Sequence, residues 1–251
     1  MIRKLVFILC AAAFALVSCG RQVTPDHPGF SPTGVPAGYM QVKFTTTGPM
    51  DFNTYRYVVV FNTSGLREGS GANQMEPYAQ NGNPSNNGAG AYLNYSFAIA
   101  VGGAGGSVSA QAIQYVPQQS SNGGTVKYPY PLVLPPQDLL LTLNSNGQQT
   151  QFTVLFPRTI FSGIFGNTSG ATPNPSSSAQ PLARVWFVNW ITVDQSGNAV
   201  YQPYGVQSPV FPGYSVDTQV QSSSPVFNEP NPPQAPSSAA QFFSGEVDNS
   251  P

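Results

Sequence analysis

Apolar and polar side chains alternate with a period of two over much of the chain after residue 38. In residues 39–46 every second position is apolar, and Gln, Lys and Thr lie between. The same alternation recurs in residues 54–62 and, most regularly, in residues 92–101. Because successive side chains of a strand point to opposite faces of its sheet, each segment is predicted to be a strand with an apolar face.

Two later segments have the pattern of β-hairpins. Apolar runs at residues 139–143 and 151–156 flank a turn sequence, Asn144-Ser-Asn-Gly147. Residues 184–204 form the second predicted hairpin, which turns at Asp194-Gln-Ser-Gly-Asn198. On the first strand of this hairpin one face would carry Val185, Phe187, Ile191 and Val193, and the other face would carry Trp186, Val188 and Trp190.

The remaining segments have turn, edge-strand and loop character. Glycines at residues 102–106 predict a turn before a returning strand at residues 108–116. Residues 126–134 are extended but contain Pro129 and Pro131, and proline confines a strand to the edge of a sheet because it lacks an N–H donor. Residues 63–90 and 157–181 are rich in Gly, Asn, Ser and Pro, which predicts long loops.

This organisation predicts an all-β fold with about eight to ten strands. We expect an antiparallel two-sheet sandwich, immunoglobulin-like or related, with long Gly, Asn, Ser and Pro loops, following an N-terminal signal helix. An alternative is two smaller sandwiches that divide near residues 117–125. The expected segments are residues 1–18, a signal peptide; 19–38, a flexible tether; 39–220, the β-sandwich; and 221–251, a Pro/Ser-rich C-terminal tail in which Phe242 and Phe243 are candidates for a last short strand.

The first nineteen residues have the pattern of an export signal. Arg3 and Lys4 precede an apolar run from Leu5 to Val17, and small residues follow. As a helix this run would be about 20 Å long, which is shorter than the roughly 30 Å hydrocarbon core of a bilayer. The pattern therefore predicts a secretory signal peptide rather than a membrane span.

The end of the apolar run is more specific. Leu16-Val17-Ser18-Cys19 resembles the lipobox of bacterial lipoproteins, and this resemblance covers residues 1–20 only. It implies cleavage between Ser18 and Cys19, S-diacylglycerol and N-acyl chains on Cys19, and anchoring of the exported protein to a membrane. Gly20 implies the outer membrane, with the outer face of the cell membrane as the alternative. Two or three acyl chains anchor a protein stably, whereas one chain binds only marginally.

Composition excludes several classes of function. Charged residues make up only 8% of the 251 residues and the formal net charge is −1, so no basic field exists to attract nucleic acid. The two cysteines are Cys10 and Cys19, and Cys10 lies in the segment predicted to be removed. The mature chain is therefore expected to form no internal disulfide.

The usual catalytic and metal-binding residue sets are not recognisable in the sequence. The single histidine, His27, lies in the tether, where it would lack the orientation that a catalytic base needs. No Cys/His set with zinc spacing occurs, and the Asp194–Asn198 segment has too few carboxylates for calcium. We therefore expect no metal, no cofactor and no catalytic site. The carboxylates considered for a hydrolase are Asp51, Glu68, Glu76, Asp138, Asp194 and Asp217, and the sequence pairs no two of them.

Aromatic side chains are the remaining candidates for binding. Trp186 and Trp190 would lie on one strand face roughly 13 Å apart, and Tyr55 and Tyr57 could extend the surface for stacking on a glycan. The competing interpretation is that these rings belong to the core. The expected function is a lipid-anchored, non-catalytic interaction or structural module of the cell envelope, with an envelope protein or a glycan as partner. The alternatives are a glycan-binding module and, less favoured, a hydrolase.

Overall fold

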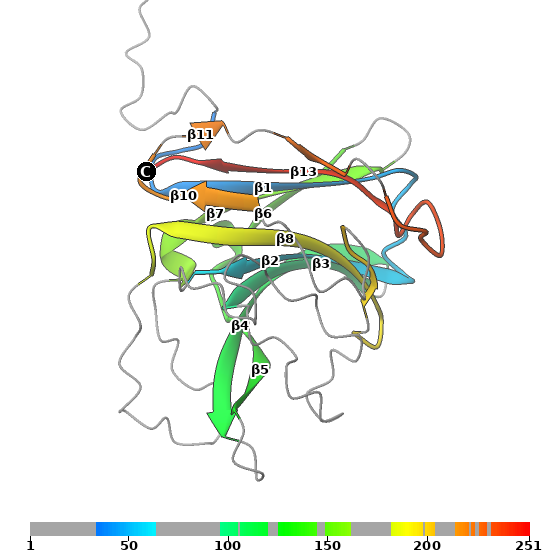
Figure 1. Ribbon diagram of the computed structural model, residues 1–251, viewed down its shortest axis with the longest axis horizontal. Coiled ribbons are helices and arrows are strands. Elements are labelled where there is room, and N and C mark those ends of the chain that lie inside the picture. The colour runs from blue at the N-terminus through cyan, green and yellow to red at the C-terminus, as the bar shows by residue number, and fades with distance from the viewer. Residues whose placement is uncertain are drawn as a thin grey trace, which may run out of the picture. The chain divides into compact units, whose positions relative to one another are not determined.

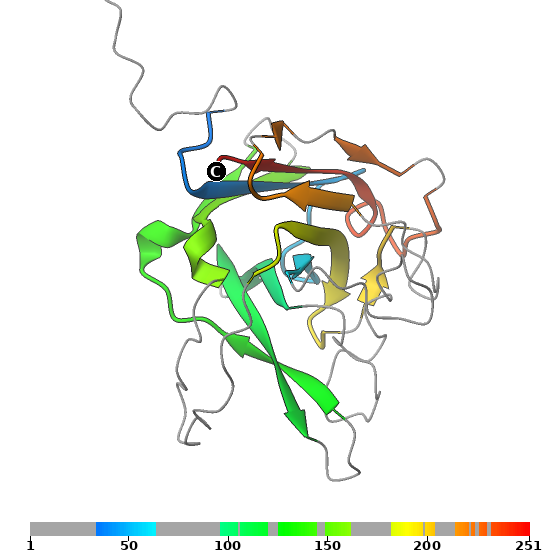
Figure 2. The ribbon, with the colours of Figure 1, turned by 60° about the vertical axis from the view of Figure 1, so that its left-hand side comes forward.

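The structure is a computed structural model of the chain (Figures 1 and 2). It describes residues 34–63, 96–104, 106–119, 125–144, 149–161, 182–197, 199–203, 214–220, 222–223, 226–229 and 232–251. Within these residues the chain forms thirteen strands, two short 3-10 helices and no α-helix. No helix in this part of the chain is long and apolar enough to cross a membrane.

The first sheet is antiparallel and has six strands. Their order is β11 (Ser222–Ser223), β13 (Phe242–Asn249), β1 (Tyr39–Thr46), β7 (Gln151–Pro157) and β6 (Leu140–Leu143). The sixth strand, β12 (Phe227–Asn228), also pairs with β13. A 3-10 helix, η2 (Pro136–Asp138), precedes β6, and another, η3 (Arg158–Phe161), follows β7.

The second sheet is also antiparallel and has seven strands. Their order is β10 (Tyr214–Asp217), β8 (Val185–Asp194), β2 (Tyr55–Asn62), β3 (Phe97–Ala104), β4 (Ser107–Gln119) and β5 (Thr125–Pro131), with β9 (Ala199–Tyr201) also paired to β8. The sheets pack face to face, with β13 over β8 and β1 over β2 (Figure 1). Strands β4 and β5 extend beyond these layers as a two-stranded ribbon (Figure 2).

The alternating pattern creates the core between the sheets. Val42 lies opposite Val154 in the β1–β7 pair, and Phe44 lies opposite Phe152; all four side chains are fully buried. The rings of Phe44 and Phe152 stack with centroids 5.5 Å apart. Such cross-strand pairs stabilise a sheet because directly opposed side chains on one face are in contact.

Trp190 closes the gap between the two sheets at β8 and β13. Its side chain is fully buried, and its Nε1 donates a 3.0 Å hydrogen bond to the carbonyl of Lys43 on β1. Its ring lies parallel to that of Phe227 on β12, with centroids 5.7 Å apart. The indole also occupies the position that a side chain at residue 245 would need, because a Cβ on Gly245 would overlap Trp190 Cε2. Glycine at this position therefore lets the sheets approach.

Over most of β2 and β8 the outer face of the second sheet is buried as well. This explains why β2 and β8 are nearly continuous apolar runs rather than alternating ones. The buried side chains of this second cluster are Val58, Val60, Ala98, Tyr115, Phe187, Ile191, Val193 and Ala199. They lie on the opposite face from Trp186, Val188 and Trp190, as the alternation along residues 185–193 predicts.

The expected fold class is confirmed, since two antiparallel sheets form a sandwich. The predicted hairpins are β6–β7 and β8–β9, and β5 is an edge strand as its prolines indicated. Residues 31–251 form one unit instead of two smaller sandwiches. The strand predicted from residue 92 begins at Phe97, and residues 92–95 lie outside the described part, as do most of the two predicted loops.

The expectation of a tail after residue 220 is wrong for its last part. Strand β13 has eight residues and lies inside the first sheet, between β1 and β11. A β-bulge near Phe243 explains why its pattern was hard to recognise. Thr45 pairs with Ser244 and Thr46 with Phe242, so the extra residue shifts the alternation by one position.

Substituting Gly245 with Ala tests the contact between the sheets. We expect a loss of about 1–3 kcal/mol in the free energy of unfolding, because the added methyl group overlaps the buried indole of Trp190. Urea denaturation measures this loss. Ser244→Ala on the same strand is the control, with an expected change within about 0.5 kcal/mol. Equal stability of the two variants would contradict the packing described.

Candidate functional site

The residues of the predicted lipidation site, Ser18 and Cys19, lie outside the described residues, as does His27. The described part of the chain begins at Gly34. The backbone of Gly38 is hydrogen-bonded to two different segments of the sandwich. Gly38 N donates to the carbonyl of Ser250 (2.8 Å), and its own carbonyl accepts from Arg158 N (3.0 Å). The segment before β1 therefore leaves the sandwich beside the end of β13.

The candidate glycan contacts are mostly in the core. Trp186 and Trp190 are 2% and 0% exposed, and Tyr57 is 0% exposed. Each indole N–H donates to a carbonyl, that of Ala183 for Trp186 and that of Lys43 for Trp190. The interpretation that these rings belong to the core is therefore confirmed, and the alternative of an exposed Trp pair is wrong, because this strand face points between the sheets. Of the four proposed contacts only Tyr55 is partly exposed.

Tyr57 is a core residue whose hydroxyl binds two backbone groups. Its hydroxyl donates to the carbonyl of Ala239 (3.0 Å) and accepts from the backbone N–H of Asp51 (2.9 Å). Burial raises the pKa of Tyr57 well above its usual value. The phenol is therefore neutral. It links the β1–β2 connection to the β12–β13 connection at the end of the sandwich where β1 ends.

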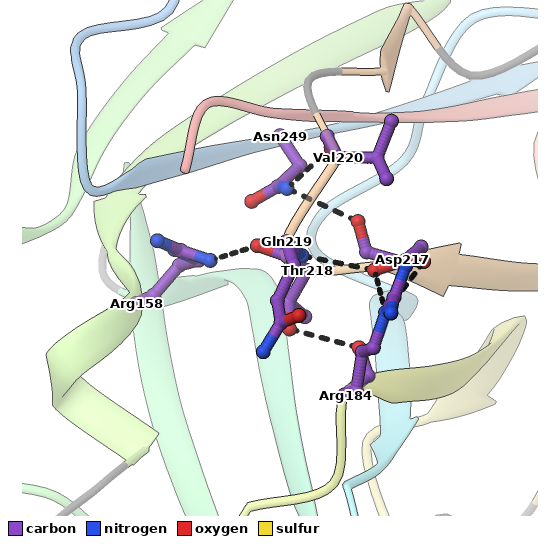
Figure 3. Close-up of polar contacts among 7 residues, drawn as sticks. All are labelled: Arg158, Arg184, Asp217, Thr218, Gln219, Val220 and Asn249. Atoms are coloured by element: carbon purple, nitrogen blue, oxygen red, sulfur yellow. Dashed lines mark hydrogen bonds and ion pairs between the residues drawn. The ribbon is translucent and has the colours of Figure 1, made fainter.

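A polar cluster lies at the opposite end, where Gly38 joins β1 (Figure 3). No sequence motif indicated this cluster. Arg184, which precedes β8, makes an ion pair with Asp217 at the end of β10 (Nη2 to Oδ2, 2.7 Å), and its Nε contacts both carboxylate oxygens. The hydrogen bond from Arg184 lowers the pKa of Asp217, and Asp217 raises the pKa of Arg184. Both groups are therefore charged at neutral pH.

The turn that follows β10 is held from both sheets. Asp217 Oδ1 accepts the N–H of Gln219, and Thr218 donates to the carbonyl of Arg184 from its backbone N–H and its hydroxyl (Figure 3). From the first sheet, Asn249 Nδ2 donates to the carbonyls of Asp217 (3.3 Å) and Val220 (3.0 Å). The cluster therefore joins the ends of β10 and β13.

Arg158 completes this cluster from η3. Its guanidinium donates to the carbonyl of Thr218, while its Nε is buried without a hydrogen-bond partner (Figure 3). Burial lowers the pKa of Arg158. Because these side chains hold backbone carbonyls and one another, the arrangement is a structural tie between the sheets. It supplies no general base, since its one carboxylate is bound to Arg184.

The carboxylates considered for hydrolysis do not form an acid–base pair in the described residues. Asp51 Oδ1 accepts the N–H groups of Asn53 and Thr54, and the hydrogen bond with the Thr54 side chain is the main cause that lowers the pKa of Asp51. A general acid needs a raised pKa. Asp194 begins a turn with Gly197 at φ +85°. Glu68 and Glu76 lie outside the described residues. Within the described residues, no group of three metal-ligating side chains occurs.

The most perturbed carboxylate is Asp248, which was counted with the tail. It lies on the outer face of β13, opposite Gln41 of β1, and is 7% exposed. Burial and, secondly, Glu246 raise the pKa of Asp248 to about 6, and Lys43 opposes this shift. Lys43 lies opposite Glu246 and forms an ion pair with it. The three groups form a charged row across β1 and β13.

Comparison with known proteins adds no functional information. The chain matches no protein family, no curated protein and no solved structure.

Substituting Asp248 with Asn tests the burial of this charge. The pKa of Asp248 rises from 3.8 to about 6 on folding, so the folded state holds the proton more tightly than the unfolded chain. Its charge therefore destabilises the fold above pH 6, and this effect disappears as the pH falls towards 4. We expect Asp248→Asn to stabilise the protein by about 1–3 kcal/mol at pH 7.5 and hardly at all at pH 4.

Asp217→Asn is the matched control, because Arg184 lowers the pKa of Asp217. This variant should gain no stability at pH 7.5. Urea denaturation at both pH values distinguishes the two carboxyl groups, and a gain from Asp248→Asn that is the same at both pH values would contradict the assignment.

Substituting Asn249 with Ala tests the tie between the sheets. Asn249 is fully buried and serves two carbonyls, so its removal should cost about 1–3 kcal/mol. Arg184→Ala should cost clearly less than Asn249→Ala, because the Arg184 side chain is 57% exposed and exposed ion pairs contribute little. A larger loss for Arg184→Ala than for Asn249→Ala in thermal or urea unfolding would overturn this ranking.

Proposed function

We propose that the protein is a lipid-anchored lipoprotein of the bacterial cell envelope, acylated on Cys19, in which the β-sandwich is a non-catalytic interaction or structural module. The observation that carries the proposal is the sequence Leu16-Val17-Ser18-Cys19 after a basic start and a short apolar run. The anchor would consist of S-diacylglycerol and an N-acyl chain on Cys19 after cleavage at Ser18–Cys19.

The way β1 begins supports a tethered module. Gly38 is hydrogen-bonded to Ser250 and Arg158, and Ser250 N donates to the carbonyl of Tyr39 (3.1 Å). A force on the segment that precedes β1 would therefore be shared between β1, the end of β13 and η3, and would not act on one strand alone. Val35 and Gly38 already belong to the sandwich, so residues 20–33 would form the free tether and would span up to about 50 Å when extended, which is enough to lift the module off a membrane.

The chemistry of the described side chains supports a non-catalytic role. The polar groups at the end of the sandwich near Gly38 bind backbone carbonyls and one another, and the indoles and Tyr57 belong to the core. The low charge content, 8%, is compatible with a module that presents a neutral polar surface. A glycan-binding role has lost its main support, because it depended on exposed tryptophan rings.

We assign the protein to the outer membrane, facing the periplasm or the cell surface, because Gly20 follows the acylated cysteine. The outer face of the cell membrane is the alternative. Membrane fractionation distinguishes the two assignments.

Cys19→Ser tests the anchor. The variant should incorporate no radiolabelled palmitate and should move from the detergent-rich phase to the aqueous phase in Triton X-114, because serine cannot receive the thioether-linked lipid. Cys10→Ser is the matched control, since Cys10 lies within the apolar run and should leave labelling intact. Unchanged palmitate labelling of Cys19→Ser would refute the proposed anchor.

A further inference from the structure

The sandwich has four sheet edges, and three of them are protected against pairing with another strand. Strand β5 contains Pro129 and Pro131, which lack N–H donors. The edge formed by β9 and β10 is interrupted along β8 and ends at the ion pair of Asp217. On the far side of β13, β11 and β12 have two residues each. Strand β6 is the remaining edge, since among the described residues only β7 pairs with it.

Strand β6 presents backbone groups that β7 does not use. Asn144 N donates to Gln151 O (3.0 Å), which continues the antiparallel β6–β7 ladder. Because hydrogen-bonding direction alternates along a strand, Leu141 and Leu143 point their N–H and C=O groups away from β7. These groups lie at the open edge of the first sheet.

The side chains of this edge are apolar and uncharged. Residues 139–143 read Leu-Leu-Leu-Thr-Leu and contain neither proline nor charge, the features that commonly protect an edge strand. Leu140 is 49% exposed on the outer face. Val133, on the connection from β5 to β6, is 77% exposed. An exposed apolar edge of this kind favours addition of a further strand.

We infer that β6 pairs antiparallel with β6 of a second copy of this chain. In the register centred on Leu141, that residue lies opposite its own equivalent, and Leu140 lies opposite Thr142 of the second copy. At each end Asp138 lies opposite Asn144, an amide, so the pair brings no like charges together. The strand is therefore complementary to itself about a two-fold axis.

This symmetry closes the assembly at two copies. An isologous pair uses the same surface patch on both copies and leaves no second β6 edge for a third one. The two-fold axis of two antiparallel edge strands is perpendicular to their sheet. If the proposed lipid anchor holds both copies on one membrane, the sheets lie parallel to its surface; this orientation rests on the proposed function, whereas the pairing does not.

The test is the mass of the full chain purified in mild detergent, measured by sedimentation velocity over the micromolar range. The wild type should have twice the monomer mass. Leu140→Lys with Thr142→Lys should halve the mass, because the register places each new lysine opposite another one. Gln41→Lys with Thr45→Lys, on the same sheet face but on β1, is the matched control and should remain dimeric.

A mixture with the Leu140→Glu/Thr142→Glu variant provides the rescue. The glutamate variant should be monomeric alone. Mixing it with the lysine variant should restore the twofold mass, and this result would also show that both variants fold. A monomeric wild type, a dimer insensitive to the lysine pair, or failure of the mixture to restore the dimer would overturn the inference. These results are independent of palmitate labelling, so they do not depend on the anchor.

Discussion

The contact between Trp190 and Gly245 is the constraint on which the sandwich depends. The indole of β8 fills the space above β13 where a side chain would otherwise lie, and it donates to a backbone carbonyl of β1. One residue thus joins three strands from two sheets, and loss of its hydrogen bond would leave a buried polar group without a partner. The same burial removes this ring from any role at the surface.

Much of the fold could be predicted from the sequence, because a strand with one dry face has a two-residue period that needs no long-range information. Residues 40–44 and 152–156 are examples, and they face one another in the core. The pattern indicates only a short last strand at Phe242 and Phe243, whereas β13 has eight residues, because its bulge at Phe243 breaks the period. For Trp186 and Trp190 the sequence favours the core over a glycan-binding surface, although alternation shows only which residues share a face and not which face is covered.

The polar cluster could not be predicted because its members are far apart in the chain. Arg158, Arg184, Asp217 and Asn249 meet only when β7, β8, β10 and β13 have assembled. Only the local Asp217–Gln219 contact had a recognisable turn sequence. The raised pKa of Asp248 likewise requires the folded register, which buries its carboxyl group and places it beside the Lys43–Glu246 pair. By contrast, the proposed lipobox, Leu16-Val17-Ser18-Cys19, is a contiguous segment, so its resemblance can be recognised from the sequence alone.

We propose that this sheet-built module, whose first strand begins beside its last one, lies at the end of a lipid-bearing tether. Intact-mass and N-terminal peptide mass spectrometry of the protein from its native membrane tests this claim most directly. It predicts that the chain begins at Cys19 and carries a diacylglycerol and an N-linked acyl chain. An unmodified amino terminus, or a mature chain that begins at any residue other than Cys19, would contradict it.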